Sequence, residues 1–173
     1  MGSAFALPCL DNNHDTNIVG THLENEFIDS LKDKENIHPG LNTEIPSGIK
    51  IFKFDEFESL LKSNVDLIVL GISSKGIEWV SEQLSKIYID TKMPNILMLT
   101  KGLSIYQNDY ELLIDKLERL LSEKGINKLN ISAVGGPCLA AGLANRVHSS
   151  VIIANKNLET AKKIADMLSL IHI

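Results

Sequence analysis

The sequence predicts an α/β fold with a mostly parallel sheet, and two observations lead to this prediction. Six short apolar runs, rich in Val, Ile and Leu, have the length and composition of strands. Amphipathic stretches, in which apolar residues recur at helical spacing, lie between them. Alternation of this kind is typical of a parallel sheet whose strands are connected by helices.

The predicted strands are short, and two of them are apolar throughout. The runs DLIVLGI and SVIIAN lack the alternation of apolar and polar residues that a half-exposed strand shows. We therefore expect these two to be central strands, covered on both faces. The six predicted strands are residues 16–20, 49–54, 66–72, 95–100, 130–135 and 150–155.

Four amphipathic helices are predicted from the apolar spacing, at residues 55–63, 76–88, 109–125 and 157–168. Gly125 is a plausible C-cap of the third helix, and Asn157 is a plausible N-cap of the fourth. The segment 32–48 contains two prolines and two glycines and is longer than a simple connection requires. We expect it to be an excursion from the fold or a functional loop.

Length and composition are those of one soluble domain. The chain has 173 residues, of which 44% are hydrophobic and 23% charged. Its net charge of −5 argues against nucleic acid or an anionic membrane as the main partner. Cys9 and Cys138 show no metal-type spacing, so we expect two thiols in a reducing compartment. With no signal sequence and no run of ~20 apolar residues, a cytoplasmic location is expected.

The opening residues, MGSA, suggest a helix that normally follows a strand. In a doubly wound, Rossmann-like domain the first strand ends in G-x-G-x-x-G, and the third glycine lies in the first helix. Gly2 fits that third glycine, and Ser3 and Ala4 are small enough for close packing. The prediction is a truncated dinucleotide-binding domain over residues 1–173 whose first strand is missing. The alternative is a sheet that simply begins with a helix.

Several segments, in order, resemble the N-terminal domain of NAD(P)-dependent glycerol-3-phosphate dehydrogenases. MGSA resembles the second half of that family's glycine-rich fingerprint, and IVGTHLENEFIDSL its second strand and turn. NIHPGLN resembles a loop containing Pro-Gly, and DLIVLGISS the fourth strand with its serine-containing turn. LTKGL resembles the [ST]-K-G-[LI] element, and AVGGPCLAAGLA the S-G-P-[SA]-x-A-x-E-[VI]-A element, with Gly142 in place of the glutamate. The resemblance spans essentially the whole chain.

This resemblance implies an oxidoreductase that interconverts sn-glycerol 3-phosphate and dihydroxyacetone phosphate by hydride transfer, with NAD or NADP as cofactor. Lys101 follows the strand NILML, at a carboxyl end where ligands bind in open α/β sheets. It is the candidate catalytic and substrate-binding cation, and its alternative role is that of a solvated lysine at a strand end. The resemblance also implies substrate contacts for Gly136 and Cys138. The implied cofactor contacts are Met1, Gly2, Ser73, Ser74, Lys101 and Ala140.

Simpler structural roles compete with these assignments. Ser73 and Ser74 could cap the helix that follows them. The glycine-rich turn around Pro137 could need small residues for packing alone, or could begin a helix whose free N–H groups bind an anion. The family usually has Ser or Ala at the position of Cys138, and a thiol is a weaker donor than a hydroxyl.

The end of the predicted strand at residues 16–20, which resembles the family's second strand, leaves the choice between NAD and NADP open. An acidic residue directly at this position would favour NAD by binding the ribose 2′-hydroxyl. Here Thr21 and His22 occupy the position, and Glu24 lies slightly beyond it.

In the family, a helical domain with a second catalytic lysine follows, and this chain contains no candidate for that lysine. We therefore expect little or no turnover from this chain alone, and a homodimeric full-length parent. One alternative is another reductase of the 6-phosphogluconate-like group, of the ketopantoate or hydroxyacid type. The other is a non-catalytic nucleotide-binding remnant.

Overall fold

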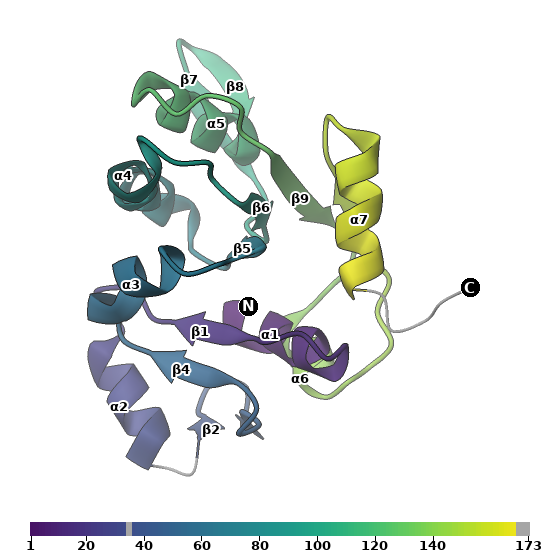
Figure 1. The fold of residues 1–173 in the computed structure, drawn as a ribbon. Helices are drawn as coiled ribbons and strands as arrows, with labels where there is room; N and C mark the ends of the chain where they lie inside the picture. The colour runs from purple at the N-terminus through teal and green to yellow at the C-terminus, as the bar shows by residue number, and fades with distance from the viewer. Residues whose placement is uncertain (34–35, 169–173) are drawn as a thin grey trace. The chain divides into compact units, whose positions relative to one another are not determined.

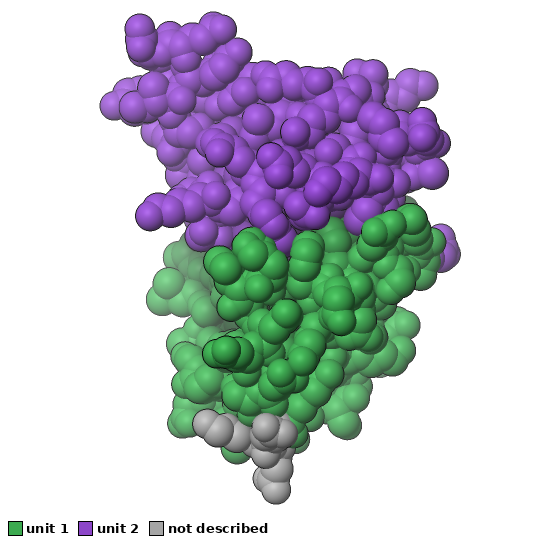
Figure 2. Space-filling view, turned by 90° about the vertical axis from the view of Figure 1, so that its left-hand side faces the viewer, with its two compact units in different colours: residues 1–63, 136–151, 163–173 green, residues 64–135, 152–162 purple. Residues whose placement is uncertain are grey.

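Strands and helices alternate along much of the chain, apart from two places where three strands follow one another (Figure 1). The computed structural model describes residues 1–33 and 36–168. The chain forms two compact units, drawn in different colours in Figure 2. Unit 1 contains residues 1–63, 136–151 and 163–173, and unit 2 contains residues 64–135 and 152–162. Each unit therefore consists of segments that are distant in sequence.

A four-stranded sheet with the order β10-β9-β6-β5 forms the centre of unit 2. Strands β5, β6 and β9 are parallel, and β10 runs antiparallel to β9. The central strand β6 is fully covered, since Ile96 and Leu97 are both 0% exposed. The prediction of a mostly parallel sheet is confirmed. The strands are β5 (Leu67–Leu70), β6 (Asn95–Met98), β9 (Ile131–Gly135) and β10 (Ile152–Ala154).

The two runs predicted as central strands lie instead at the edges of this sheet. Among the described strands, β5 pairs only with β6, and β10 pairs only with β9. Ile152 at the start of β10 is 68% exposed, so the apolar run 150–155 is not covered on both faces. An antiparallel edge strand on an otherwise parallel sheet is a common arrangement, and an apolar run alone does not reveal it.

Helices α4 and α5 provide most of the apolar side chains that complete the core of unit 2. Leu84, Leu117 and Leu121 are all 0% exposed. Gly125 has φ +87°, and Thr160 N–H donates to Asn157 Oδ1 at 3.2 Å, so both predicted caps are confirmed. The helices with residues in unit 2 are η2 (Ser74–Gly76, 3₁₀), α4 (Ile77–Tyr88), α5 (Leu113–Glu123) and α7 (Leu158–Leu168).

A β-hairpin replaces the first turn of the helix predicted at 109–125. It consists of β7 (Leu103–Tyr106) and β8 (Asp109–Leu112), and α5 begins only at Leu113. Gln107 and Asn108 form the turn with φ +51° and +67°, the geometry that two-residue hairpin turns require. On one face, Arg119 of α5 donates to Glu111 at 2.8 Å and lies over the Tyr106 ring. The other face is exposed, with Ile105 at 75% and Tyr110 at 77%.

Unit 1 is built around its first helix, α1 (Gly2–Asp11), which is buried along most of its length. Its short parallel pair, β1 (Asn17–Val19) and β4 (Lys50–Phe52), confirms two further predicted strands. Helix α1 packs against α6 (Ala140–Ala144). Arg146, just beyond α6, donates two hydrogen bonds to Asp11, both at 2.9 Å. The core cluster comprises Ala6, Leu7, Ile28, Leu31, Ile45, Ile49 and Ala144.

The described part of the long segment 32–48 contains a small hairpin. Strands β2 (Ile37–His38) and β3 (Thr43–Glu44) pair antiparallel. Helix α2 (Asn25–Asp33) precedes them and was missed by the sequence analysis. The remaining elements of unit 1 are η1 (Phe54–Glu56, 3₁₀) and α3 (Phe57–Leu61), where a helix was predicted. In the described part of the chain, no helix is long and apolar enough to cross a membrane.

Candidate functional site

The carboxyl ends of β5 and β6 bring Ser73 and Lys101 to one edge of the unit 2 sheet. Leu70 and Met98, the last residues of the two strands, are paired in register. Beyond them, the Thr100 hydroxyl donates to the Ile72 carbonyl. Ser73 and Lys101 each directly follow one of these two bonded residues, and both are exposed. The edge of a parallel sheet at which ligands bind therefore presents a serine and a lysine side by side.

Gly102 allows the chain to turn immediately after Lys101. Its φ of +134° is one that L side chains rarely adopt, and a Cβ at this position would lie 3.4 Å from Leu113 Cδ1. The backbone conformation therefore requires a glycine at this position. It directs the chain from the sheet edge into the β7–β8 hairpin.

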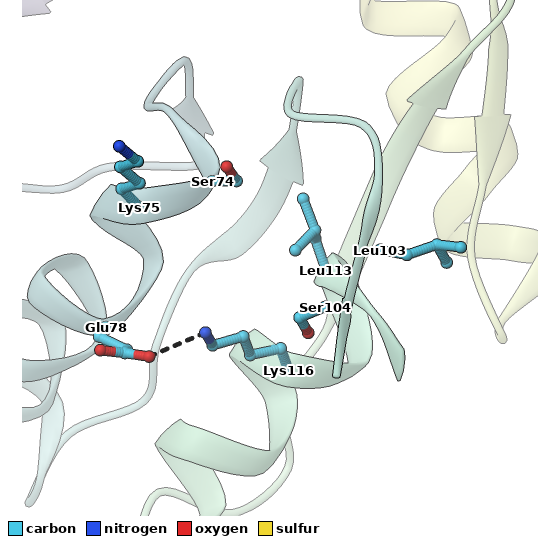
Figure 3. Close-up of a pocket in the computed structure, with 7 residues that line it drawn as sticks. All are labelled: Ser74, Lys75, Glu78, Leu103, Ser104, Leu113 and Lys116. Atoms are coloured by element: carbon cyan, nitrogen blue, oxygen red, sulfur yellow. Dashed lines mark hydrogen bonds and ion pairs between the residues drawn. The ribbon is translucent and has the colours of Figure 1, made fainter. Parts of the chain in front are cut away.

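Ser74 lines a surface pocket of about 360 Å³ in unit 2, shown in Figure 3. The pocket lies between the start of α4, strand β7 and the start of α5. Along one side of the pocket, Lys116 Nζ donates to Glu78 Oε1 at 2.8 Å, and this ion pair neutralises both charges. Neither Ser73 nor Lys101 lines it. The lining residues are Ser74, Lys75, Glu78, Leu103, Ser104, Leu113 and Lys116.

Ser73 and Ser74 do not cap the following helix with their side chains. Ser73 occupies the N-cap position of η2, but no hydrogen bond from its side chain caps the helix. The Ser73 carbonyl instead accepts the first hydrogen bond of this 3₁₀ turn, from Gly76 N–H at 2.9 Å. The side-chain capping role considered from the sequence is therefore not the one observed.

The segment after β9 differs from the expectation for Pro137. Helix α6 begins at Ala140, three residues later, and has only five residues. Cys138 N–H donates to the Gly136 carbonyl at 3.0 Å, so it is not available to an anion. The prediction that Pro137 starts an anion-binding helix is wrong. The chain turns after β9 at Gly136, which has φ +94°.

Of the two residues predicted as pocket walls, Gly136 is exposed and Cys138 is buried. The Cys138 side chain is 4% exposed, so it packs inside the protein. A thiol is a weaker hydrogen-bonding group than a hydroxyl, so it is less costly to bury at this position. Both cysteines are thiols, as predicted, and both are buried.

The start of α1 has the features of a helix end that accepts an anion. Met1 is the N-cap and provides no side-chain cap, and the first turn contains no acidic residue. Gly2 and Ser3 are small and only half-buried. Backbone N–H groups at such a helix start can bind phosphate, so these residues fit the diphosphate of a dinucleotide. Since α6 packs on α1, Ala140 belongs to the same helix pair.

The Glu24 carboxylate, which in the sequence lies beyond the end of β1, bonds back to the residue that follows this strand. Thr21 N–H donates to Glu24 Oε2 at 2.7 Å, and Glu24 N–H donates to the Thr21 carbonyl at 2.9 Å. This reciprocal turn resembles a capping box in front of α2. The Thr-x-x-Glu spacing is the sequence signal that could have revealed it.

The family model for the N-terminus of NAD-dependent glycerol-3-phosphate dehydrogenase matches residues 1–161. The chain belongs to this family. Among its curated relatives, the NADP(+)-dependent glycerol-3-phosphate dehydrogenase of Archaeoglobus fulgidus is 28% identical over 170 residues, which cover 96% of this chain and 47% of that protein. The glycerol-3-phosphate dehydrogenase [NAD(P)+] of Rickettsia typhi is 36% identical over 104 residues, covering 60% of this chain and 30% of the relative.

Solved structures show the same fold. The glycerol-3-phosphate dehydrogenase of Coxiella burnetii superposes with a TM-score of 0.77 at 18% identity, covering 96% of this chain and 47% of that one. The enzyme of Plasmodium falciparum gives a TM-score of 0.75 at 16% identity, covering 98% and 46%. As a member of the glycerol-3-phosphate dehydrogenase family, the chain thus spans about half the length of the relatives it matches.

Proposed function

We propose that this chain provides the dinucleotide-binding part of an NAD(P)-dependent glycerol-3-phosphate dehydrogenase. That enzyme would interconvert sn-glycerol 3-phosphate and dihydroxyacetone phosphate. One observation carries the proposal: Lys101 and Ser73 stand at the same carboxyl edge of a parallel sheet, next to the bond from Thr100 to Ile72. The family match over residues 1–161 supports it independently.

The proposed chemistry assigns Lys101 to the substrate. The nicotinamide, when bound, supplies or accepts the hydride. The ammonium of Lys101 would polarise the oxygen on the reacting carbon of the substrate and stabilise negative charge that develops there. In unit 2, Ser73 and Ser74 would contact the cofactor together with Lys101. In unit 1, Met1, Gly2 and Ala140 would do so, and Gly136 would contact the substrate with Cys138 packed behind it.

The wider biological setting follows the same proposal. The partner is a small phosphorylated substrate, without nucleic acid or membrane. The location is the cytoplasm, and the full-length parent is a homodimer. Residues 1–173 would act as one Rossmann-like, dinucleotide-binding domain, and turnover would require a second lysine that this chain does not contain.

Titration of the purified chain with NADH, followed by nicotinamide fluorescence, tests the proposal. We expect saturable binding, and in the presence of NADH we expect dihydroxyacetone phosphate to bind as well. Replacing Lys101 by Met should weaken substrate binding about tenfold or more, since it removes a direct charge contact with the substrate. Lys92→Met is the matched control, because Lys92 is exposed and precedes β6, at the opposite edge of the sheet.

Two results would contradict the proposal. Absence of nucleotide binding would refute dinucleotide recognition, and an equal effect of the two lysine substitutions would refute the role of Lys101. A coupled hydride-transfer assay should give little or no turnover. Normal rates would show that this chain needs no second lysine.

A further inference from the structure

We propose that Glu24 makes the nucleotide site of this chain selective for a dinucleotide without a 2′-phosphate, that is, for NAD over NADP. The inference rests on the proposed function and goes beyond it, because the curated relatives include an NADP(+)-dependent enzyme. In the sequence Glu24 lies beyond the end of the strand, and the folded structure brings its carboxylate back to that end.

The position of the Glu24 carboxylate is fixed by the turn that ends β1. Gly20 N–H continues the ladder by donating to the Phe52 carbonyl at 3.0 Å, so the chain is still paired there. In the next residue, Thr21 N–H donates to Glu24 Oε2 at 2.7 Å. One carboxylate oxygen is thereby held at the carboxyl end of the strand, while the exposed side chain leaves the other oxygen open to a ligand.

In doubly wound folds the strand that follows the glycine-rich helix ends at the adenosine ribose. A carboxylate there accepts hydrogen bonds from the ribose 2′-hydroxyl and repels a 2′-phosphate. Strand β1 is the strand that follows α1 in this chain. Glu24 therefore has the chemistry and the place that select the unphosphorylated ribose.

Carboxylates also surround the lysine that follows β4, the strand paired with β1. Lys53, directly after β4, forms an ion pair with Asp29 at 2.7 Å. Hydrogen bonding to Asp29, with further attraction from Asp55 and Glu56, raises the pKa of Lys53. An NADP-binding site needs a cation that can turn to the 2′-phosphate. Here the lysine is surrounded by carboxylates, which would also repel a phosphate dianion.

Calorimetric titration of the full chain with NAD⁺ and NADP⁺, at one ionic strength and up to millimolar concentrations, tests the inference. We expect NAD⁺ to bind at least about tenfold more tightly, the effect of about one unit of charge at close range. The pair 5′-AMP and adenosine 2′,5′-bisphosphate probes the adenosine end alone and should show the same order.

Glu24→Gln removes the charge but keeps an oxygen for the Thr21 N–H. We expect it to raise the affinity for NADP⁺ about tenfold and to weaken NAD⁺ binding several-fold. Glu26→Gln is the matched control, since Glu26 is an exposed carboxylate in the first turn of α2. It should change either affinity less than twofold.

The outcomes separate the inference from the proposed function. Equal affinities, tighter binding of NADP⁺, or equal effects of the two glutamate substitutions would overturn the role of Glu24 and leave the proposed function standing. Binding of none of the four nucleotides would overturn both.

Discussion

At the residue scale, buried polar and titratable side chains fix parts of the fold that do not belong to the candidate site. Asn155, just after β10, uses its side-chain amide to donate to Asn130 Oδ1 at 3.0 Å and Ser132 Oγ at 2.7 Å. Ser132 is 0% exposed, so this partner satisfies a group that would otherwise be costly to bury. The short strand β10 is thus attached to β9 through side chains as well as through its ladder.

Cys9 provides a pH-dependent prediction. Burial in α1 raises the pKa of its thiol to about 11. The folded-state pKa lies above the ordinary value, so the contribution of the thiol to stability is complete below that value and is lost as the pH rises towards 11. At pH 8 the folded chain should therefore hold a thiolate fraction about a hundredfold lower than the unfolded chain.

The measurement is the rate of reaction with Ellman's reagent in the variant Cys138→Ala, in which Cys9 is the remaining cysteine. We expect a reaction at least about a hundredfold slower without urea than in urea, because the folded structure also limits access. Equal rates would show that α1 is not packed as described.

The sequence identified Lys101 because its position depends only on local pattern: a lysine directly after a buried strand. Glu24 could not be placed in the same way, because its carboxylate reaches the strand end only through the turn bond to Thr21. The burial of Cys138 was equally inaccessible, since it depends on the tertiary surroundings of a loop. Local signals thus predicted which residues follow strands, and tertiary contacts decided where their side chains lie.

At the element scale, the apolar pattern of the segment 103–125 is compatible with one long helix and also with a hairpin followed by a shorter helix. Leu112 and Leu113 belong to a continuous helical pattern in the sequence, yet Leu112 ends β8 and Leu113 begins α5. The turn at Gln107 and Asn108 was the decisive signal, and it lacks the Asn-Gly or Asp-Gly pair that usually marks a hairpin. The strands and helices with stronger patterns, such as β6 and α4, were predicted almost to their ends.

The turn at Gly102 determines whether this hairpin can form. In Gly102→Ala a side chain would be forced to φ +134°, which should lower the free energy of unfolding by about 1–3 kcal/mol. Gly142→Ala is the matched control. Gly142 lies inside α6, where a Cβ meets only Ser149 Oγ at 3.9 Å, so alanine should add up to about 1 kcal/mol.

Urea denaturation followed by circular dichroism measures both changes. A Gly102→Ala chain as stable as the wild type would show that this backbone conformation is not required.

At the scale of the whole molecule, the strands of both units leave edges that no described strand covers. Strand β1 pairs only with β4, and β5 pairs only with β6, among the described residues. Each of these strands therefore has one row of backbone N–H and C=O groups that no described strand pairs.

Open strand edges and the exposed face of the β7–β8 hairpin should make the chain associate in solution. We expect sedimentation velocity to show species larger than a monomer, in proportions that rise with protein concentration. A strictly monomeric chain at every concentration, with a cooperative thermal transition at high temperature, would contradict this expectation.

The pairing of α1 with α6 has a consequence for the timing of biosynthesis. Asp11 and Arg146, which join the ends of these helices, are 135 residues apart. At about 5–20 residues per second, a ribosome needs roughly 7 to 27 seconds to make the intervening chain. During that interval the apolar surface of α1 has emerged without its partner, so the nascent chain is a natural client for chaperones that shield apolar segments.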